Sequence, residues 1–558
     1  MMVKIMEVIL VAWVLVSTHG IFTLAGAVNL APDGLGEVLL FPYYTVRNGN
    51  MTLLSIINTR QRVKAVKLRF LEGKNGQPVL DFNLYLSPQD VWTGSLAQSA
   101  TGTVLTTTDK SCTVPAIPPA GVEFSNTAYA MTSPDGEDTS LDRTREGYFA
   151  AFDMGVVTDS ALAAAATHID GLPQNCAALQ QAWTTGVWAL TPSMGMGFDP
   201  GGLWGSLQLV NVNQGTDYGA SAIALGGFFS TAIHTAASAP LPNLSSANPE
   251  TDILTQANPA GGVPSVVHST WPQNSQGGVD AVSAVLMRRA VINEYTIDPA
   301  LAARTDWVVN FPTKRFYVPI HNSTNGGIPI VATPPFTQSF WTGGAPEAVA
   351  LSLRDREEQV NKGSAAMLPW AVNVMTFRDI SVLGSALTLA IDTANMGNNG
   401  WMKLKFPVTP NPISSRQNIH ELIDNEGSAY LGLPVMGFAV EAYGNKDAHY
   451  RELLPHKFSR DIAMSLDEVI AKTIPPKVAM PKTSASKLSM EKAACQTAIE
   501  MEIELQTARG SATVNGALAM IACQAAAAII AASPQVPIGA AAIEAAVKAA
   551  AIAAITHQ

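Results

Sequence analysis

The sequence predicts a mainly β protein: an immunoglobulin-like β-sandwich body of two β-units, with a small helical insertion and an alanine-rich helical tail. Two observations predict the β body. Between residues 36 and 96, short runs alternate apolar with polar residues, and turn-forming residues separate the runs. Successive side chains of a strand point to opposite faces, so each run can bury one face. Turns at intervals of roughly 8–12 residues are typical of β-sandwiches.

The strands of this stretch follow from where the apolar residues fall. Lys67 and Arg69 alternate with three apolar residues, and residues 80–86 alternate in the same way. We therefore expect each of these two strands to have one face in water and one face in the core. Residues 53–57 carry apolar side chains that point to both faces, which favours a central strand.

Residues 1–27 are predicted to be an export signal. Lys4 supplies the positive charge, residues 8–16 supply the apolar core, and Ala25-Gly26-Ala27 supplies the small residues of a cleavage site. An uncleaved membrane anchor is the alternative, but the apolar run is short for a membrane span. We expect cleavage after Ala27 and a protein that is secreted, or lies at the cell surface, in the periplasm or on the exterior of the outer membrane.

The composition excludes some classes of protein. Hydrophobic residues make up 47% of the 558 residues, so the chain can bury a large core and is not disordered as a whole. This length allows more than one domain. Charged residues make up 14%, and the formal net charge is −10. A nucleic-acid partner is not expected, because binding phosphates requires a basic surface.

The first unit, residues 28–200, continues with strands and two short helices. In order, the predicted elements are a strand within Gly121–Met131, a charged surface loop at Pro134–Arg145, a strand at Glu146–Val157, a helix at Asp159–Thr167 and a helix within Asn175–Trp188. Asp159 can cap the first helix, because its carboxylate accepts hydrogen bonds from the free amides of the first turn. The two helices form the small helical insertion.

Four cysteines, Cys112, Cys176, Cys495 and Cys523, are expected to form disulfides, because an exported protein meets an oxidising compartment. Four cysteines allow three pairings, and bridges within each region of the chain are the simplest choice. A bridge from Cys112 to Cys176 would pin the helical insertion to the preceding loop. The chain has no C-x-x-C pair, so neither a thioredoxin-like nor a zinc-ribbon site is supported.

Several segments resemble a known family. They are FPYYTV from Phe41, LSPQDVW from Leu86, DKSCTVPAIPPAGV from Asp109, RTREGYFAAFDMG from Arg143, VLMRRAVINEYTID from Val285 and TDWVVNFPTKRFYV from Thr305. From about Val28 to Arg460 the chain is similar to a family of uncharacterised exported proteins of Gram-negative bacteria. The resemblance implies export and a shared β-rich body. It implies no catalytic residues, because none are established for that family.

A second β-rich unit is predicted over residues 201–465. Its strands are Leu203–Val212, Ala220–Phe229, Ala348–Arg354, Ala386–Ile391, Met402–Phe406 and Val435–Tyr443. Ser238–Gly278 is rich in Pro, Ser and Asn and is expected to form a loop outside the core. Val279–Tyr295 fits a helix or a strand. Trp307–Val318 is expected to be a strand broken at Pro312, as at a sheet edge or a bulge.

The composition changes towards the C-terminus. A Pro-containing linker at 466–483 precedes an alanine-rich helical tail at 484–558, with helices expected at about 485–508, 512–532 and 538–556. Cys495 and Cys523 lie equally far from Arg509, so a hairpin of the first two helices would pair them. A helix that is apolar all round must be covered by protein or lipid. Small side chains favour a packed bundle or self-association over a membrane hairpin.

No catalytic, cofactor or metal site is predicted. The chain contains neither H-E-x-x-H nor G-x-S-x-G nor a phosphate-loop pattern. The nine histidines are His19, His168, His234, His268, His321, His420, His449, His456 and His557. His449 and His456 could share a metal, but surface histidines are the simpler interpretation. A hydrolase triad needs no local motif, so a secreted hydrolase stays an alternative.

Two groups of residues point to binding. Four carboxylates of the charged loop could gather oxygen ligands for Ca²⁺, although their spacing is not that of an EF-hand, and a solvated loop is the alternative. Four tryptophans could form a surface on which sugar rings stack, or they could fill the core. The carboxylates are Asp135, Glu137, Asp138 and Asp142, and the tryptophans are Trp204, Trp307, Trp341 and Trp401.

These observations together favour a secreted or cell-surface structural protein that is not an enzyme. It is expected to act through its β-sandwich surface and to associate with copies of itself or with other cell-surface components. A module that binds carbohydrate or calcium outside the cell is the first alternative, and a secreted hydrolase is the second.

Overall fold

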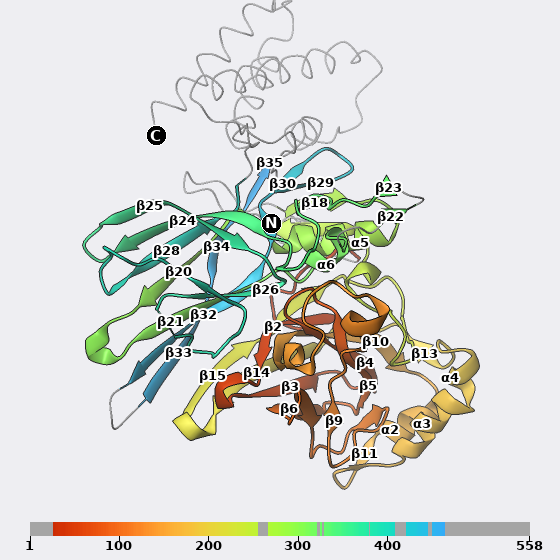
Figure 1. Cartoon of the computed structure of the whole chain (residues 1–558). Coiled ribbons are helices and arrows are strands. Elements are labelled where there is room, and N and C mark those ends of the chain that lie inside the picture. Colours follow the sequence, from red (N-terminus) through yellow and green to blue (C-terminus); the bar gives the residue numbers. More distant parts are fainter. Residues whose placement is uncertain are drawn as a thin grey trace, which may run out of the picture.

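The computed structural model describes residues 26–254, 266–320, 324–325, 328–378, 380–407, 420–444 and 449–463. In these residues the protein is mainly β and consists of several antiparallel sheets (Figure 1), which confirms the predicted fold class at this level. Residues 1–25 of the export signal, the linker 466–483, the tail 484–558 and the predicted Cys495–Cys523 pair lie outside the described residues.

Eight strands form the first sheet of the N-terminal half, which we define as residues 26–254. In spatial order they are β1 (Asn29–Leu30), β16 (Ile223–Gly226), β2 (Val38–Thr45), β10 (Glu146–Val157), β4 (Lys64–Glu72), β5 (Pro78–Leu86) and β8 (Cys112–Val114), with β13 (Met196–Gly197) paired to β10. β10 has the bounds predicted from the sequence. All 12 of its residues are buried, as expected for a strand between two neighbours.

Six strands form the second sheet, which packs against the first. They are β15 (Thr216–Ser221), β14 (Leu203–Asn211), β3 (Met51–Asn58), β6 (Val91–Gln98), β7 (Thr103–Thr106) and β9 (Val122–Glu123). Phe82 of β5 meets Trp92 of β6 with ring centroids 5.6 Å apart. A Cβ at Gly205 of β14 would lie 2.7 Å from the Phe41 ring of β2, so a glycine is required for the two sheets to approach this closely.

The predicted central strand is present as β3, which lies between β14 and β6. Only one of its faces is buried, however. Leu54 and Ile56 point into the core, whereas Leu53 and Ile57 are half-buried on the outer face. The run of apolar residues therefore predicted the position of the strand in its sheet, but not the exposure of its outer side.

Lys67 and Arg69 on β4 contradict the prediction of a face in water, because both side chains are buried. The segment 232–242, which follows β16, covers them. Lys67 Nζ donates hydrogen bonds to the carbonyl oxygens of Ala236 at 3.0 Å and Ala239 at 2.6 Å, and Arg69 forms an ion pair with Asp81 at 2.8 Å. Alternation identifies polar positions, but it does not show that a segment far along the chain satisfies them.

The predicted boundary between units near residue 200 is also wrong, because it falls inside the N-terminal sheets. β14 pairs with β3, β15 pairs with β14, and β16 pairs with β2, although all three strands follow residue 200. The strands that close both sheets thus return from beyond the helical insertion. A turn-rich sequence gives no signal for such a long-range return.

Two five-stranded sheets form the C-terminal half, which we define as residues 266–463. The first contains β25 (Val360–Leu368), β24 (Glu347–Asp355), β28 (Asn399–Lys405), β20 (Ala290–Thr296) and β34 (Lys457–Ser459). The second contains β27 (Thr388–Ala390), β26 (Val372–Thr376), β21 (Arg304–Asn310), β32 (Met436–Gly444) and β33 (His449–Pro455). Trp307 of β21 is fully buried and donates a hydrogen bond to the Glu294 carbonyl of β20 at 2.9 Å, which joins the two sheets.

Smaller pairings complete the β structure. They are β29 (Glu421–Ile423) with β30 (Ala429–Leu431) and β35 (Asp461–Ala463), β17 (Glu250–Leu254) with β18 (Val266–Thr270), β19 (Met287–Arg288) with β31 (Leu433–Pro434), β11 (His168–Ile169) with β12 (Leu172–Pro173), and β22 (Thr324–Asn325) with β23 (Ile328–Pro329).

The stretch Ser238–Gly278 is not the loop outside the core that its composition predicts. It contains β17, β18 and the start of α5 (Ser275–Leu286), and it buries Ile253 and Trp271. α5 also settles the ambiguity of Val279–Tyr295, since a helix up to Leu286 precedes strand β20. Nearly the whole of α5 is buried, so it lacks the apolar and polar faces by which a surface helix is recognised.

For Trp307–Val318 the sequence predicts a strand broken at Pro312, as at a sheet edge or a bulge; only the part before the break is a strand, and it does not lie at a sheet edge. β21 ends at Asn310 and α6 (Lys314–Tyr317) follows. β21 lies inside its sheet, between β26 and β32. Pro312 comes after the end of the strand, so its missing amide removes no hydrogen bond from the sheet.

The helical insertion projects from the N-terminal half, and both predicted helical regions are present. α2 (Ser160–Ala166) is capped by Asp159, whose Oδ1 accepts hydrogen bonds from the Ala161 and Leu162 amides at 3.0 Å. α3 (Cys176–Thr184) and α4 (Val187–Leu190) follow. A disulfide joins Cys112 on β8 to Cys176 at the start of α3, as expected, and it attaches the insertion to the first sheet.

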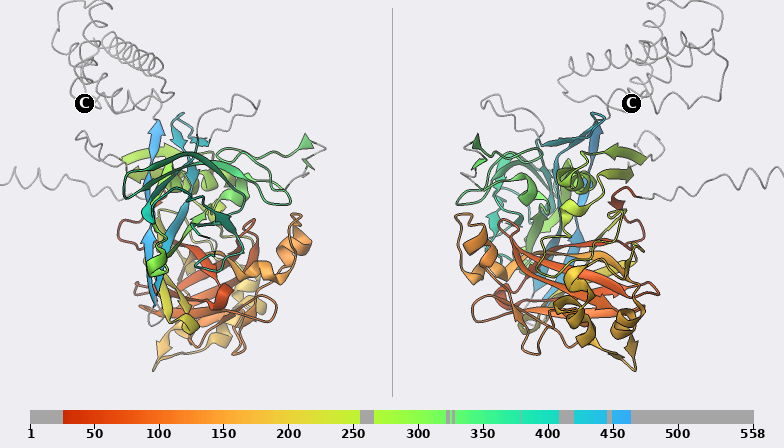
Figure 2. Two further views of the ribbon diagram at one scale, coloured as in Figure 1. Left: turned by 60° about the vertical axis from the view of Figure 1, so that its left-hand side comes forward. Right: turned by 90° about the vertical axis from the view of Figure 1, so that its right-hand side faces the viewer.

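The N-terminal and C-terminal halves lie against each other in all three ribbon views, with the helical insertion at the end of the molecule far from the C-terminal half (Figures 1 and 2). A single cluster of buried apolar side chains extends through both halves. Polar side chains also cross the boundary: Asn310 Nδ2 donates to the Pro42 carbonyl at 2.7 Å, and Asn50 Nδ2 donates to the Leu383 carbonyl at 3.1 Å.

Candidate binding cleft and apolar lobe

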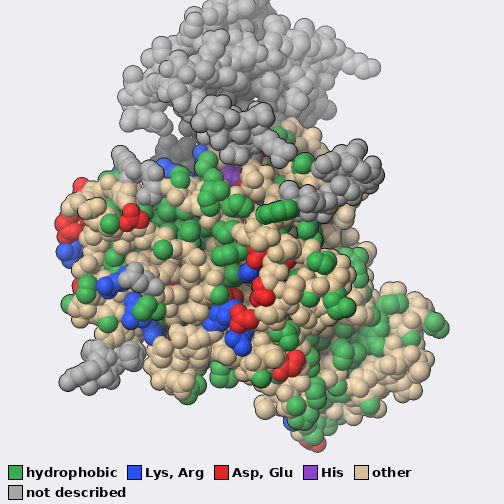
Figure 3. Space-filling model, in the orientation of Figure 1, with side chains coloured by type: hydrophobic (Ala, Val, Ile, Leu, Met, Phe, Trp, Pro, Cys, Tyr) green, Lys and Arg blue, Asp and Glu red, His purple; other side chains and the backbone are tan. Residues whose placement is uncertain are grey.

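A cleft of about 550 Å³ opens where the two halves meet. All the charged side chains among its lining residues are arginines, so we call it the arginine cleft. The N-terminal half contributes Arg47, Asn48, Gln98 and Arg145, and the C-terminal half contributes Thr376, Arg378, Ile380, Ser381, Gly384, Ser385, Thr388 and Ala390. Figure 3 shows positive and negative side chains gathered near the boundary between the halves.

The local structure holds two of these arginines at the ends of buried strands. Arg47 begins a tight turn, Arg47–Gly49, between β2 and β3. Asn48 has a φ of 55° in this turn, a left-handed conformation that asparagine tolerates better than most residues. Arg145 ends a 3₁₀ turn, Leu141–Arg145, directly before β10. Both side chains therefore start from backbone that the core fixes.

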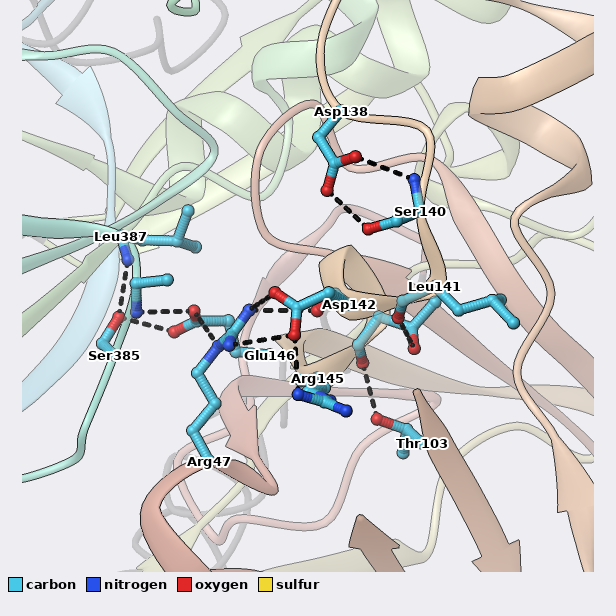
Figure 4. Close-up of polar contacts among 12 residues, drawn as sticks. Arg47, Thr103, Asp138, Ser140, Leu141, Asp142, Arg145, Glu146, Ser385 and Leu387 are labelled. Carbon is cyan, nitrogen blue, oxygen red and sulfur yellow. Dashed lines mark hydrogen bonds and ion pairs between the residues drawn. The ribbon is translucent and has the colours of Figure 1, made fainter. Parts of the chain in front are cut away.

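Glu146, the first residue of β10, lies behind the cleft and connects the two halves (Figure 4). Its side chain is 2% exposed. It accepts hydrogen bonds from Arg47 Nε at 2.7 Å and Tyr43 Oη at 3.0 Å, both from the N-terminal half. From the C-terminal half, Ser385 Oγ donates at 2.5 Å and the Ala386 amide at 2.9 Å.

Asp142 lies on the other side of the Arg47 guanidinium (Figure 4). Arg47 Nη2 donates to Asp142 Oδ2 at 2.7 Å, and Arg145 Nη1 donates to Oδ1 at 2.7 Å. The hydrogen bond from Arg47 holds the pKa of Asp142 below its usual value. Burial works against the charge of Arg47, but Glu146 and Asp142 raise the pKa of its guanidinium. Arg47 therefore keeps its positive charge, and the carboxylates of Glu146 and Asp142 balance that charge.

The opposite wall is held by a buried carboxylate. Asp306 on β21 accepts hydrogen bonds from Ser381 Oγ at 2.6 Å and from the Leu383 amide at 3.1 Å. Burial raises the pKa of Asp306 to about 6. Asp306 of the C-terminal half binds Ser381, and Glu146 of the N-terminal half binds Ser385. The loop that carries these two serines is therefore held in place by both halves.

Two arginines of the cleft keep donors that no carboxylate of the described residues accepts. Arg378 is exposed, and its Nη1 donates to the Ile297 carbonyl at 3.3 Å. Arg145 pairs with Asp142 through Nη1 alone, and its buried Nε has no hydrogen-bond partner among the described atoms. The exposed guanidinium of Arg378 can therefore bind an anionic group, and that of Arg145 keeps nitrogens that Asp142 does not bind.

A second feature lies on the helical insertion. Six of its apolar side chains are exposed, and we call them the apolar lobe: Ile169, Leu172, Val187, Leu190, Met194 and Phe198. Leu190 is the extreme case, at 92% exposure. The sequence from 158 to 200 contains no Lys or Arg, so no long cationic side chain is available within it to cover this surface. Hydrophobic side chains are also visible over this end of the molecule in Figure 3.

The base of the lobe is rigidly packed. Trp188 stacks on Tyr85 of β5 with centroids 5.4 Å apart, and Trp183 Nε1 donates to Tyr85 Oη at 2.7 Å. His234, from the segment that covers β4, lies 2.9 Å from Tyr85 Oη and 2.6 Å from the Pro192 carbonyl. Together with the disulfide, these contacts fix the position of the lobe, and in this position its six apolar side chains are exposed to solvent.

The charged loop does not present its carboxylates as a calcium site. Asp135 is buried and forms a bidentate pair with Arg143, Glu137 pairs with Lys74 at 2.5 Å, and Asp142 pairs with the cleft arginines. Asp138 accepts hydrogen bonds from Ser140. Among the described residues, no group of three or more His, Cys, Asp or Glu side chains is arranged to hold a metal ion.

The four tryptophans do not lie together. Trp307 is in the core, whereas Trp204 and Trp401 are partly exposed on different sheets, and Trp341 is exposed in the loop before β24. The histidine pair is not shown either. His456 bonds Asn293 and the Val308 carbonyl, and the side chain of His449 lies outside the described set. His420 is buried and bonds the Pro335 carbonyl.

Sequence reasoning missed the arginine cleft. The parts of the chain that meet at the cleft are far apart in the sequence, since Ser385 and Glu146, which are hydrogen-bonded behind it, are separated by 239 positions. No short motif connects them. The helices of the described part of the chain include none with the length and apolar composition of a membrane span. Comparison with protein-family models, curated proteins and solved structures finds no match.

Proposed function

We propose that the protein is an exported structural or assembly protein that acts outside the cytoplasm by contact with copies of itself. The apolar lobe is the observation that carries this proposal. An exposed apolar surface costs free energy in water, and such patches mark surfaces that bind a partner. The six exposed side chains of the lobe are apolar, and the base of the lobe is tightly packed. The lobe can therefore bind a partner without first becoming ordered.

Two further features support the proposal. Val28, the residue expected to follow the cleavage point, is fully buried, and its amide donates to the Glu250 carbonyl at 2.7 Å. In a chain that starts at Val28, the new amino group would donate to this same carbonyl oxygen, which offsets part of the cost of burying its charge. The alanine-rich sequence of the tail also requires an apolar cover, which neighbouring copies would supply.

The N-terminal half is proposed to be immunoglobulin-like in the broad sense of two antiparallel sheets packed face to face. The contacts of Phe82 with Trp92 and of Gly205 with Phe41 support a sandwich. The eight-stranded and six-stranded sheets together contain more strands than the seven to nine of an immunoglobulin domain, so the proposal concerns the architecture alone.

Sedimentation of the chain from Val28 to Gln558 over a range of concentrations tests self-association. We expect oligomers for the unchanged protein and weaker association for the double variant Leu190→Ser, Met194→Ser, because serine removes apolar area from the contact. Val212→Ser is the matched control: Val212 is 74% exposed but lies on the turn after β14, outside the lobe.

A monomer at all concentrations would contradict the proposal. If the lobe variant and Val212→Ser weakened self-association equally, the lobe would not be the contact surface. A truncated form of the chain that ends at Leu466 separates the two proposed contacts. Self-association that survives the truncation depends on the lobe, whereas self-association that is lost depends on the tail.

A further inference from the structure

We propose that the arginine cleft binds an anionic saccharide, with the acidic group of the sugar at Arg145 and Arg378 and the sugar hydroxyls at the neutral polar side chains of the cleft. This site is separate from the apolar lobe and from the assembly proposed above. Four properties of the cleft support this ligand: its unused cationic donors, its neutral polar lining, its size and its preorganised walls.

The cationic donors point to an oxyanion. Arg47 is neutralised by Glu146 and Asp142, but Arg145 shares only one of its nitrogens with Asp142, and Arg378 bonds only a carbonyl oxygen among the described residues. Guanidinium groups bind carboxylate and sulfate oxygens through two parallel hydrogen bonds, and these charge-assisted bonds are stronger than neutral ones. The arginines therefore favour a ligand that carries such a group.

The rest of the lining favours a ligand with many hydroxyls. Asn48, Gln98 and Thr388 offer amide and hydroxyl groups, and the described lining has no aromatic side chain. Ile380 and Ala390 supply a small apolar part. A sugar ring presents hydroxyls around its edge, and an acidic sugar adds the anion that the arginines require. A volume of about 550 Å³ lies within the usual range for small-molecule sites.

The walls of the cleft are preorganised. Glu146 binds Arg47 on one side and Ser385 on the other, and Asp306 holds Ser381. These carboxylates lie behind the lining, so they fix the positions of the polar groups without meeting the ligand. A site that is ordered before binding loses less entropy when the ligand enters.

Isothermal titration of the chain from Val28 to Gln558 tests the site with four probes: digalacturonic acid, a sulfated heparin disaccharide, neutral cellobiose and inorganic sulfate. The first two distinguish a carboxylate from a sulfate as the anion. We expect at least one of them to bind, binding to weaken with added salt, and cellobiose and inorganic sulfate to bind at least about tenfold more weakly.

Arg378→Gln is expected to weaken binding about tenfold, because an exposed arginine loses its charge-assisted bonds while the fold stays intact. Arg356→Gln is the matched control, since Arg356 is 73% exposed and lies outside the cleft. Thr388→Glu places a carboxylate at an exposed position in the lining and is expected to abolish binding.

Three results would overturn the proposal. They are no binding of either acidic saccharide, equal affinity of the Arg378→Gln and Arg356→Gln variants, and binding of cellobiose as tight as that of the acidic probes. Inorganic sulfate that binds as tightly as the disaccharides would overturn the sugar part and leave a general oxyanion site in its place.

Discussion

Glu146 is the residue on which the contact between the two halves depends most directly. It is almost completely buried and accepts hydrogen bonds from two side chains of one half and from Ser385 and the Ala386 amide of the other. A buried carboxylate of this kind is stabilised by its partners, and removing one member of such a set leaves the others unpaired in a medium of low dielectric constant.

Glu146→Gln is expected to lower the free energy of unfolding by about 3 kcal/mol, because Arg47 loses its buried counter-charge and an amide donor faces other donors. Asp142→Asn is the control. The Asp142 side chain is 45% exposed, so its pair with Arg47 is screened by water and its loss is expected to cost less than about 1 kcal/mol. Urea unfolding at pH 7 measures both. Equal costs would show that the buried network does not join the halves.

His234 connects stability to pH. The Pro192 carbonyl can only accept a hydrogen bond, so Nδ1 carries the proton and Nε2 accepts from Tyr85 Oη. Burial lowers the pKa of His234 to about 4, below the value of about 6.5 expected in the unfolded chain. Between these two pH values the unfolded chain binds more protons than the folded one. Stability therefore increases with pH in this window and is lost as pH falls from about 6.5 to about 4.

His234→Asn is expected to remove this part of the pH dependence. Between pH 6.5 and pH 4, the free energy of unfolding of the unchanged protein should fall by up to about 3 kcal/mol more than that of the variant. Asp306, whose raised pKa of about 6 makes stability fall as pH rises above its unfolded value, acts in both proteins and cancels in the difference. Urea midpoints measured across this range give the comparison. Parallel curves would mean that folding does not lower the pKa of His234.

At the scale of elements, the disulfide and the aromatic base determine how the helical insertion is held. Cys112 and Cys176 are 64 positions apart, and the bridge joins α3 directly to β8 at the edge of the first sheet. The helices themselves are short, and short helices have little stability of their own. Tertiary contacts and the cross-link therefore carry the insertion.

Replacing Cys112 and Cys176 together by alanine is expected to lower the free energy of unfolding by about 2–5 kcal/mol, since the unfolded chain regains the freedom that the bridge removes. Thermal unfolding with and without reductant measures this. Reductant should lower the melting temperature of the unchanged protein by more than that of the double variant, which keeps only Cys495 and Cys523. A double variant as stable as the unchanged protein would show that the aromatic contacts alone hold the insertion.

The elements also show what the sequence could predict. β10 follows from the strand-like composition of its residues, and α2 follows from its capping Asp159. α5 could not be predicted with the same certainty. It has Gly277 and Gly278 in its first turn, and a Cβ at Gly278 would lie 2.7 Å from the carbonyl oxygens of Ser245 and Ala247. Close packing requires these glycines there, against their low helix propensity, and only the tertiary structure reveals that packing.

The candidate sites were less predictable than the elements, for a similar reason. The Cys112–Cys176 pair follows from the grouping of cysteines along the chain. Arg47, Arg378 and Ser385 meet only because the halves pack together, and their spacing carries no motif. The four carboxylates of the charged loop have the composition of a calcium site, yet three of them form ion pairs with Lys or Arg and the fourth, Asp138, accepts hydrogen bonds from Ser140. Composition predicts charge, and the fold decides which partner satisfies it.

At the scale of the whole molecule, strands that are far apart in the sequence share a sheet, so the sheets do not correspond to consecutive units of the chain. β14, β15 and β16 return to the N-terminal sheets after the insertion, and a common core joins both halves. The apolar lobe keeps six apolar side chains exposed at the end of the N-terminal half that lies away from the C-terminal half (Figure 1). Under the function proposed above, this end of the molecule would contact a partner.

Hydrogen exchange of the chain from Val28 to Gln558, measured at low and at high protein concentration, tests the central claim most directly. We expect slower exchange at high concentration in the backbone amides of residues 168–198, with little change in the sheets of the C-terminal half. Exchange that is independent of concentration in this segment, or slowed only elsewhere, would contradict contact through the apolar lobe.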